Sequence, residues 1–393
     1  MGLNDIKILR QNGGVPATLP GEDHYSGLIF YADDAQMPTP NSGVAGFSTT
    51  NRIIQISTIE YAESLGITPA AAGIIPILHY HLREAFRINP GIMLWVGIFN
   101  NPIGIPNFKE IKTMQIFASG KIRQIGVYLS TVEFSSGQLA GLQGISTELE
   151  ENYMPLSILY SPKITSISSL TSSASIGLKN VSVLIGQSGD SEVKDLFDTH
   201  EVSVGIVGNA LGMLSKMSVH ESIAWVAKCP TGIDIPAFSD GTLLKTVDIG
   251  VVNTLNDNRF IFLRTFGGMV GSFYNDSFTM DIQTSDYNAI ERVRTMDKAC
   301  RGIRTYLLPH LNSPLYVDPA TGMLEPNTVA FLQNEAGRAL EDMERVGELS
   351  GYVVEINPNQ NVLASSMVEI VIRQVPVGVM RKIQVKIGFT TKI

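Results

Sequence analysis

Apolar and polar residues alternate regularly in one segment near the end of the chain. In Val379–Phe389, one face carries Ile383, Val385, Ile387 and Phe389 and the other carries Lys382, Gln384 and Lys386. A period of two is typical of a half-buried β-strand, so we expect a strand here. A terminal strand can leave its own domain and pair with a neighbouring copy. Its backbone N–H and C=O groups would then link two subunits.

The opposite end of the chain has a comparable segment. Leu3–Arg10 mixes apolar and polar residues over eight positions and is followed by the pair Gly13-Gly14. Its candidate contact residues are Leu3, Ile6 and Ile8. We therefore expect a second extended arm, connected to the rest of the chain by a hinge.

Between the two ends, the first half of the chain alternates short apolar runs with helical patterns. The expected strands lie at 26–35, 52–56, 92–99, 122–129, 155–160 and 181–185, and the expected helices at 57–65, 70–88, 107–118 and 136–151. Helices between continuous apolar strands predict an α/β domain with a mainly parallel sheet that has helices on both faces.

The second half has a different order of elements. A Gly-rich helix is expected at 203–216, a strand-and-loop region at 250–279, helices from an Asp286 cap to Leu307 and from an Asn327 cap to about Leu349, and strands at 352–357 and 367–375. This order predicts an α+β C-terminal domain. The expected division is an N-terminal arm (1–25), an α/β domain (26–200), an α+β domain (201–378) and a C-terminal arm (379–393).

Composition and charge narrow the class of protein. Of 393 residues, 44% are apolar and only 17% charged, which fits either a large core or surface buried in an assembly. The formal net charge of −8 argues against a general nucleic-acid binder. Residues 369–393, however, hold five basic side chains against one acid, which favours self-association or an acidic partner.

Targeting signals are not evident in the sequence. No apolar run is long enough to span a membrane, and the first residues lack the order of a signal peptide. We expect synthesis in a cytoplasm and no direct membrane insertion.

Several patterns invite an enzyme hypothesis, but each has a simpler explanation. Ser188 lies in Gly-Gln-Ser-Gly, which lacks the second glycine of a nucleophile elbow. The glycines of Gly205–Gly212 fit no nucleotide-binding motif, and close helix packing explains them. His79 and His81 are two apart on a predicted helix and cannot share a metal, so we expect one buried and one exposed. We predict no enzymatic activity, no cofactor and no metal.

Three further expectations concern single residue types. The cysteines Cys229 and Cys300 have no metal-ligand spacing and are expected to be buried. Trp95 and Trp225 stand in apolar strings and are expected in the core. The acidic residues around Glu341 alternate with arginines on a predicted helix, which is typical of a solvated or partner-facing surface.

Taken in order along the chain, these segments resemble the contractile tail sheath proteins of bacteriophages and related injection machines. The resemblance is carried by Leu82–Gly91 followed by Met93–Ile98, Ser218–Val226, Phe238–Leu244, Leu255–Thr265 with Gly267 to Gly271, the helix with Asn288, Arg292 and Arg294, residues 327–351, and the closing strands Met367–Ile393. It covers most of residues 26–393. The short N-terminal region suggests a minimal sheath without extra outer domains.

The resemblance implies a structural subunit. Copies would stack as hexameric rings around a tail tube, exchange their terminal strands, and contract to drive the tube through a target envelope. Tube, baseplate and tail terminator proteins would be its partners. The particle would be a virion tail assembled in a bacterial cytoplasm, or a phage-tail-like injection particle.

The resemblance also assigns roles to two sets of residues. Leu3–Arg10 and Val379–Phe389 would be the exchanged arms. The helix at 327–349 would face the tube, through Glu335, Arg338, Glu341, Asp342 and Arg345. With Glu344 and Glu348, this helix has five carboxylates against two arginines, so a basic surface is expected on the tube. The alternatives are a non-contractile tube or filament subunit, a hydrolase using Ser188 and His220, and a module binding a nucleotide at Gly205–Gly212.

Overall fold

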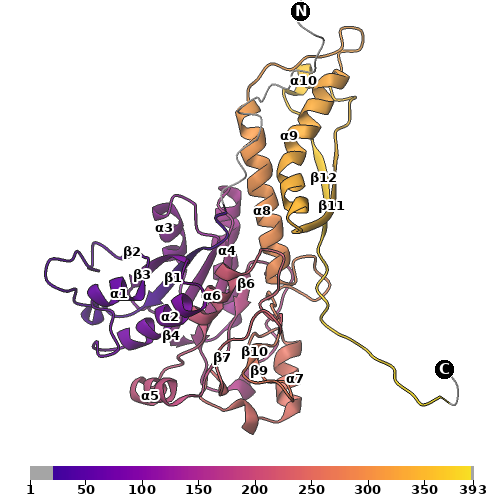
Figure 1. Cartoon of the computed structure of the whole chain (residues 1–393). Helices are drawn as coiled ribbons and strands as arrows, with labels where there is room; N and C mark the ends of the chain where they lie inside the picture. The colour runs from indigo at the N-terminus through magenta and orange to yellow at the C-terminus, as the bar shows by residue number, and fades with distance from the viewer. Residues whose placement is uncertain (1–20, 391–393) are drawn as a thin grey trace, which may run out of the picture.

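The computed structural model describes residues 21–390, and a mainly parallel sheet lies at the lower left of the view in Figure 1. Within these residues the sheet has six strands in the order β2-β3-β1-β4-β5-β6. They are β1 (Tyr25–Tyr31), β2 (Ile53–Ile56), β3 (Met93–Phe99), β4 (Gln124–Glu133), β5 (Ser157–Lys163) and β6 (Val181–Val183). All neighbours are parallel except β2 and β3. The predicted mainly parallel sheet is confirmed.

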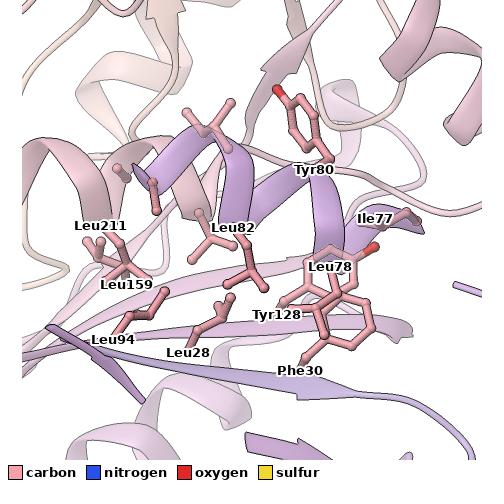
Figure 2. Packing of buried hydrophobic residues seen from close by; sticks show 14 of the residues in the cluster. Leu28, Phe30, Ile77, Leu78, Tyr80, Leu82, Leu94, Tyr128, Leu159 and Leu211 are labelled. Atoms are coloured by element: carbon pink, nitrogen blue, oxygen red, sulfur yellow. The ribbon is translucent and has the colours of Figure 1, made fainter. Parts of the chain in front are cut away.

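Helices cover both faces of this sheet. One face packs against α1 (Ile59–Ser64), α2 (Ile75–Ile88) and α6 (Val207–Lys216), and the other against α3 (Lys109–Phe117) and α4 (Ser136–Glu151). Figure 2 shows Leu78 and Leu82 of α2 above Leu28 and Leu94 of the strands. Alternate residues of one strand enter different cores, as Leu28 and Ile29 do.

Local sequence explains several helix ends, but not always as predicted. The helix expected at 57–65 is α1, and the sequence Ser57-x-x-Glu60 predicts a cap at Ser57. The cap is instead Thr58, one residue later, whose side chain accepts from the Tyr61 N–H. The helix predicted to begin at 70 begins at Ile75, because Gly73 has a positive φ of 62° and Pro76 occupies the first turn. Helix α4 has the predicted bounds, with Ser135 and Gln138 forming a capping box.

The chain continues through short elements beside the sheet. These are β7 (Gly186–Ser188), α5 (Ser191–His200), β8 (Pro236–Phe238), α7 (Ile249–Asp257), β9 (Leu263–Arg264) and β10 (Phe273–Tyr274), with 3-10 turns at Asp34–Gln36, Ile167–Ser169, Leu244–Thr246 and Leu308–His310. Region 250–279 was expected to be strand and loop, and its helix α7 corrects that. Asp248 caps α7, and Val251, Val252 and Leu255 fall on the one face that meets the core.

Two long helices and a β-hairpin extend away from the sheet and its surrounding elements (Figure 1). They are α8 (Ile290–Leu307), α9 (Pro326–Arg345), β11 (Leu349–Glu355) and β12 (Val371–Pro376), with the short α10 (Val362–Ser365) before β12. The caps predicted at Asp286 and Asn327 were wrong. Ala289, held by an isolated bridge to Phe278, precedes α8, while Glu325 precedes Pro326 at the start of α9.

We call residues 21–289 the body, 290–376 the C-terminal unit, and 379–393 the C-terminal arm. The fold is a mixed α/β arrangement followed by an α+β region, as expected. Helix α6 lies beyond the boundary predicted at residue 200, yet it packs on α2 and in the same core as the sheet. The predicted division into domains remains a prediction.

Candidate functional site

The hairpin of β11 and β12 is the least covered sheet of the molecule. Its strands are antiparallel, with Val353 opposite Arg373 and Val354 opposite Ile372. One face, with Val354 and Ile372, packs on Leu340 and Met343 of α9. The other face leaves Val353 44% and Val375 58% exposed. Neither outer edge has a partner strand within residues 21–390.

The described part of the C-terminal arm, residues 379–390, begins below the lower end of this hairpin and extends away from the packed elements (Figure 1). From Val379 to Phe389 the described arm belongs to no strand. Ile383, Val385 and Ile387 are between 71% and 97% exposed. A strand is defined by its ladder of backbone hydrogen bonds, and here no second strand lies alongside. The strand predicted at Val379–Phe389 is therefore not formed within the single chain, and its pairing with another copy stays a prediction.

The N-terminal arm cannot be compared in the same way. Leu3, Ile6 and Ile8 lie outside the described residues, so this arm also stays a prediction.

Helix α9 presents the charged residues predicted to face a partner, but most of them are paired with one another. Arg338 donates to Glu335 (2.9 Å), and Arg345 donates to Asp342. Asp342 also accepts from the Tyr306 hydroxyl. Glu341 is exposed and has no ion pair among the described residues. The role of this face remains a prediction.

Glu348 does not belong to that face. Helix α9 ends at Arg345, and Glu348 lies in the following turn, only 5% exposed, where it accepts from Lys298 of α8 (2.7 Å). The sequence count of five carboxylates on the helix was therefore too high. A helix estimated to reach Leu349 placed this glutamate on a surface that it does not share.

Buried and half-buried charges join the C-terminal unit to the body. Lys298 also donates to Asp23 at the start of the body (2.6 Å), so one lysine connects three segments. Beside Lys298 on α8, burial raises the pKa of Asp297 to about 7. Burial, with the nearby Arg123, lowers the pKa of Arg301 to about 10. No pattern along the sequence indicated this cluster, because its members lie far apart along the chain.

The residues of the hydrolase hypothesis do not form a catalytic set. The Ser188 hydroxyl is buried and donates to Asp190 (2.5 Å), which is the N-cap of α5. No hydrogen bond joins Ser188 to His220 in the described part of the chain. Ser188 thus helps to start a helix, in line with the simple turn that the sequence favoured.

The glycines of Gly205–Gly212 serve close helix packing. A Cβ on Gly208 would lie 2.1 Å from the backbone oxygen of His81, and one on Gly212 would lie 2.8 Å from that of Ala85. Helices α2 and α6 can approach each other only because these positions have no side chain. The packing interpretation is confirmed.

The two histidines of α2 are both buried, so the prediction that one is exposed was wrong. His79 shares a hydrogen bond with Glu63 (3.0 Å). Burial lowers the pKa of His81 to about 3, and its Nδ1 accepts from the Gly208 N–H. Helix α6 covers the side of α2 that carries His81, while His79 contacts Glu63 of α1, so both residues end up inside.

Two further single-residue expectations were wrong and two were confirmed. Trp95 and Cys229 are buried as predicted. Trp225 is 49% exposed with Lys228 over its ring, and Cys300 is exposed.

Two other kinds of feature are absent from residues 21–390. No cluster of three or more His, Cys, Asp or Glu side chains there could hold a metal ion. None of the helices in that range combines the length and the apolar character needed to cross a bilayer.

Comparison with known families matches two segments of the chain to the two domains of one family. Residues 131–278 match the N-terminal domain of DUF2586, and residues 286–393 match its C-terminal domain. The two matches together span more than half of the chain. No protein of curated function matches the sequence.

Solved structures share the fold at low sequence identity. One similar chain comes from the cryo-EM structure of the anti-feeding prophage (AFP) baseplate, with a TM-score of 0.63, 13% identity and full coverage of both chains. Another is from the sheath complex of an extracellular contractile injection system, PVC, in its contracted state, with a TM-score of 0.62, 12% identity and coverage of 100% of this chain and 98% of the other. The sheath tail protein Lin1278 from Listeria innocua has a TM-score of 0.53, 10% identity and coverage of 91% and 96%.

Proposed function

Since the chain belongs to the DUF2586 family, with both of its domains, and shares the fold of tail sheath proteins, we propose that it is a subunit of a contractile tail sheath. Its copies stack as hexameric rings around a tail tube and contract to drive that tube through a target envelope. The observation that carries the proposal is the combination of an open-edged hairpin and an extended segment, residues 382–389, that joins no strand among the described residues. The whole chain also aligns with a chain of the PVC sheath complex.

The arm has the chemistry of a donated strand. Ile383, Val385, Ile387 and Phe389 form one apolar stripe, and each is more than two thirds exposed. Apolar surface of this kind is costly in water, and pairing with another copy would bury it while satisfying the backbone groups. The lysines on the opposite face keep the unpaired arm soluble and hinder pairing with wrong partners.

The hairpin has the matching features of an acceptor. Either open edge of β11 and β12 offers unpaired backbone groups, and the face toward α9 is apolar. A third strand added there would place its apolar side chains toward α9 and its lysines toward solvent. Glu355, which pairs with Arg373 on the outer side of the hairpin, would then attract those lysines.

Leu3–Arg10 acts in the same way in our proposal, through Leu3, Ile6 and Ile8. Two donated strands, one from each end, would connect each subunit to two neighbours. Such main-chain links can persist while the packed bodies move between extended and contracted arrangements.

The tube-facing surface is the exposed side of α9. Because Glu335 and Asp342 are neutralised by Arg338 and Arg345, the exposed Glu341 and Glu344 provide the uncompensated negative charge of α9. A basic complement on the tube would explain this arrangement. The affinity of the extended sheath for the tube should fall as the salt concentration rises. An affinity that does not depend on salt concentration would refute the charge hypothesis.

The remaining partners follow from the same assembly. Baseplate and tail terminator proteins would bound the sheath at its two ends, in a virion tail or in a phage-tail-like injection particle assembled in the cytoplasm.

Negative-stain microscopy of the purified full chain tests the proposal. Long hollow cylinders are expected, and uniform monodisperse particles under all assembly conditions would overturn it. Cylinders that never change length or width when stressed would instead favour a non-contractile tube or filament.

A further inference from the structure

One residue of the C-terminal arm, Arg381, is bound to the rest of the molecule. Its Nε donates to both carboxylate oxygens of Asp276, at 2.9 and 3.1 Å. Its Nη2 donates to Glu291 Oε1 at 2.5 Å and lies 3.4 Å from the hydroxyl of Ser277. A single guanidinium thus contacts the end of the body and the first turn of α8.

The carboxylate of Glu291, which accepts from Arg381, is buried and held in place by a further hydrogen bond. Glu291 is only 3% exposed, and its second oxygen accepts from the Ser277 hydroxyl at 2.6 Å. Ser277 is in turn hydrogen-bonded to Ser222 at 2.9 Å. A buried carboxylate is costly without a cation beside it, and among the described residues Arg381 is its ion-pair partner.

This contact differs from an ordinary surface ion pair. Exposed pairs contribute little, because both side chains stay hydrated and mobile. Here the Glu291 side chain is 3% exposed and that of Asp276 13%, and two carboxylates hold one planar guanidinium. Charge-assisted bonds of this geometry fix direction as well as position.

The contact also divides the arm into two parts. Met380, immediately before it, is 77% exposed, and Ile383 and Ile387 beyond it are 71% and 97% exposed. The hairpin strand β12 ends at Pro376, so the chain leaves the C-terminal unit and crosses to Asp276. The next residues, 382–389, are exposed and join no strand among the described residues, and we call them the free strand.

We propose that Arg381, held by Asp276, Ser277 and Glu291, is a latch that fixes the point and direction at which the free strand leaves the subunit. This inference rests on the proposed function, because the free strand is the one donated to a neighbour. A pull on the arm then acts on the start of α8 and not on β12. The hairpin, which has only two strands, is thereby protected from being peeled apart.

Three single variants of the full chain separate the latch from general charge effects. Arg381→Gln removes the guanidinium, Arg381→Lys keeps the charge but not the fork, and Lys382→Gln is the matched control one residue further on. The rate of backbone hydrogen exchange in the unassembled protein reports on the latch directly. We expect Arg381→Gln to speed exchange at residues 276–278 and in the first turn of α8 by about tenfold or more, Arg381→Lys to fall between, and Lys382→Gln to match the parent chain.

A double-mutant cycle distinguishes a direct interaction between Arg381 and Glu291 from a general destabilisation of this region. If the latch is real, Arg381→Gln and Glu291→Gln together should change exchange by much less than the product of their separate effects. Independent, multiplicative effects would overturn the proposal, as would equal behaviour of Arg381→Gln and Lys382→Gln.

Two truncations then connect the latch to assembly. A chain ending at Lys382 keeps the latch and loses the free strand, so it should show parent-like exchange at residues 276–278 but no cylinders. A chain ending at Pro376 should lose both. Faster exchange in the first chain would overturn the latch, whereas failure of the parent chain itself to form cylinders would count against the sheath proposal and leave the exchange comparison intact.

Discussion

The six-stranded sheet of the body and the two-stranded hairpin of the C-terminal unit differ in how their faces and edges are covered. In the body, strands such as β1 and β4 are buried on both faces and paired on both sides. In the hairpin, one face and both edges are open among the described residues. Two strands in isolation are marginal, and α9 supports only one face. The inner strands of the body sheet have both neighbours within the chain, whereas each strand of the hairpin has one open edge among the described residues.

The largest expected effect lies in the body, at the contact between α2 and α6. Gly208→Val would force a side chain against the backbone of His81, where even a Cβ would lie 2.1 Å from the oxygen. We expect a loss of about 3 kcal/mol or more in the free energy of unfolding, measured by urea denaturation.

Gly144→Ala provides the matched control for that substitution. Gly144 is exposed in α4, and an alanine Cβ there would have no neighbouring atom within 4 Å, so alanine should raise stability by about 0.5–1 kcal/mol. Equal effects of the two substitutions would show that the close helix contact is unimportant.

A second substitution asks whether the C-terminal unit unfolds by itself. Leu340→Ala empties a fully buried position in the small cluster with Met343 and Leu349 and should cost about 3 kcal/mol. Hydrogen exchange should accelerate in α9 and β11 while β1 and β4 keep their protection. Leu363→Ala, at a position 73% exposed, is the control. Uniform acceleration in both regions would mean that they form one cooperative unit.

The third and smallest effect concerns the junction between the two regions. Burial raises the pKa of Asp297 to about 7 from an ordinary value of 3.8. The folded state therefore binds the proton of Asp297 more tightly than the unfolded state does. The contribution of this bound proton to the free energy of unfolding is full below pH 3.8 and is lost as pH rises through 7. Asp297→Asn cannot ionise and should become more stable than the parent chain by about 1–2 kcal/mol at about pH 8.

The effect is measured as the difference in free energy of unfolding between Asp297→Asn and the parent chain, from about pH 4 to pH 8. The exposed Asp257→Asn in α7 serves as the control. A constant difference between Asp297→Asn and the parent chain at all pH values would show that the carboxyl does not titrate in the folded junction.

Sequence reasoning succeeded where local patterns and burial agree. Continuous apolar runs located the strands of the central sheet, and the bounds of α4 were predicted in full. It failed where a neighbour decides the environment: His81 is covered by α6 and His79 contacts Glu63 of α1, so both are buried. Trp225 faces solvent although it stands in an apolar string. The caps of α8 and α9 were misplaced because Phe278 and Pro326 set those helix starts.

The candidate site was predicted only in part. The alternation at Val379–Phe389 marked the arm, and Arg381 was counted there as one more basic residue. Nothing in the sequence connects it to Asp276 and Glu291, which precede it by 105 and 90 positions. Likewise Glu348 was counted on the exposed face of α9 until its contact with Lys298 placed it inside.

The sequence by itself determined the order of the strands and covering helices of the central sheet, the parallel character of that sheet and the apolar stripe of the arm, because periodicity is a property of neighbours along the chain. The tertiary structure decided which sheet edges stay open, which charges are buried, and where the arm becomes free. These depend on segments that meet only after folding, since ion pairs and uncovered edges are set by distance in space and not along the chain.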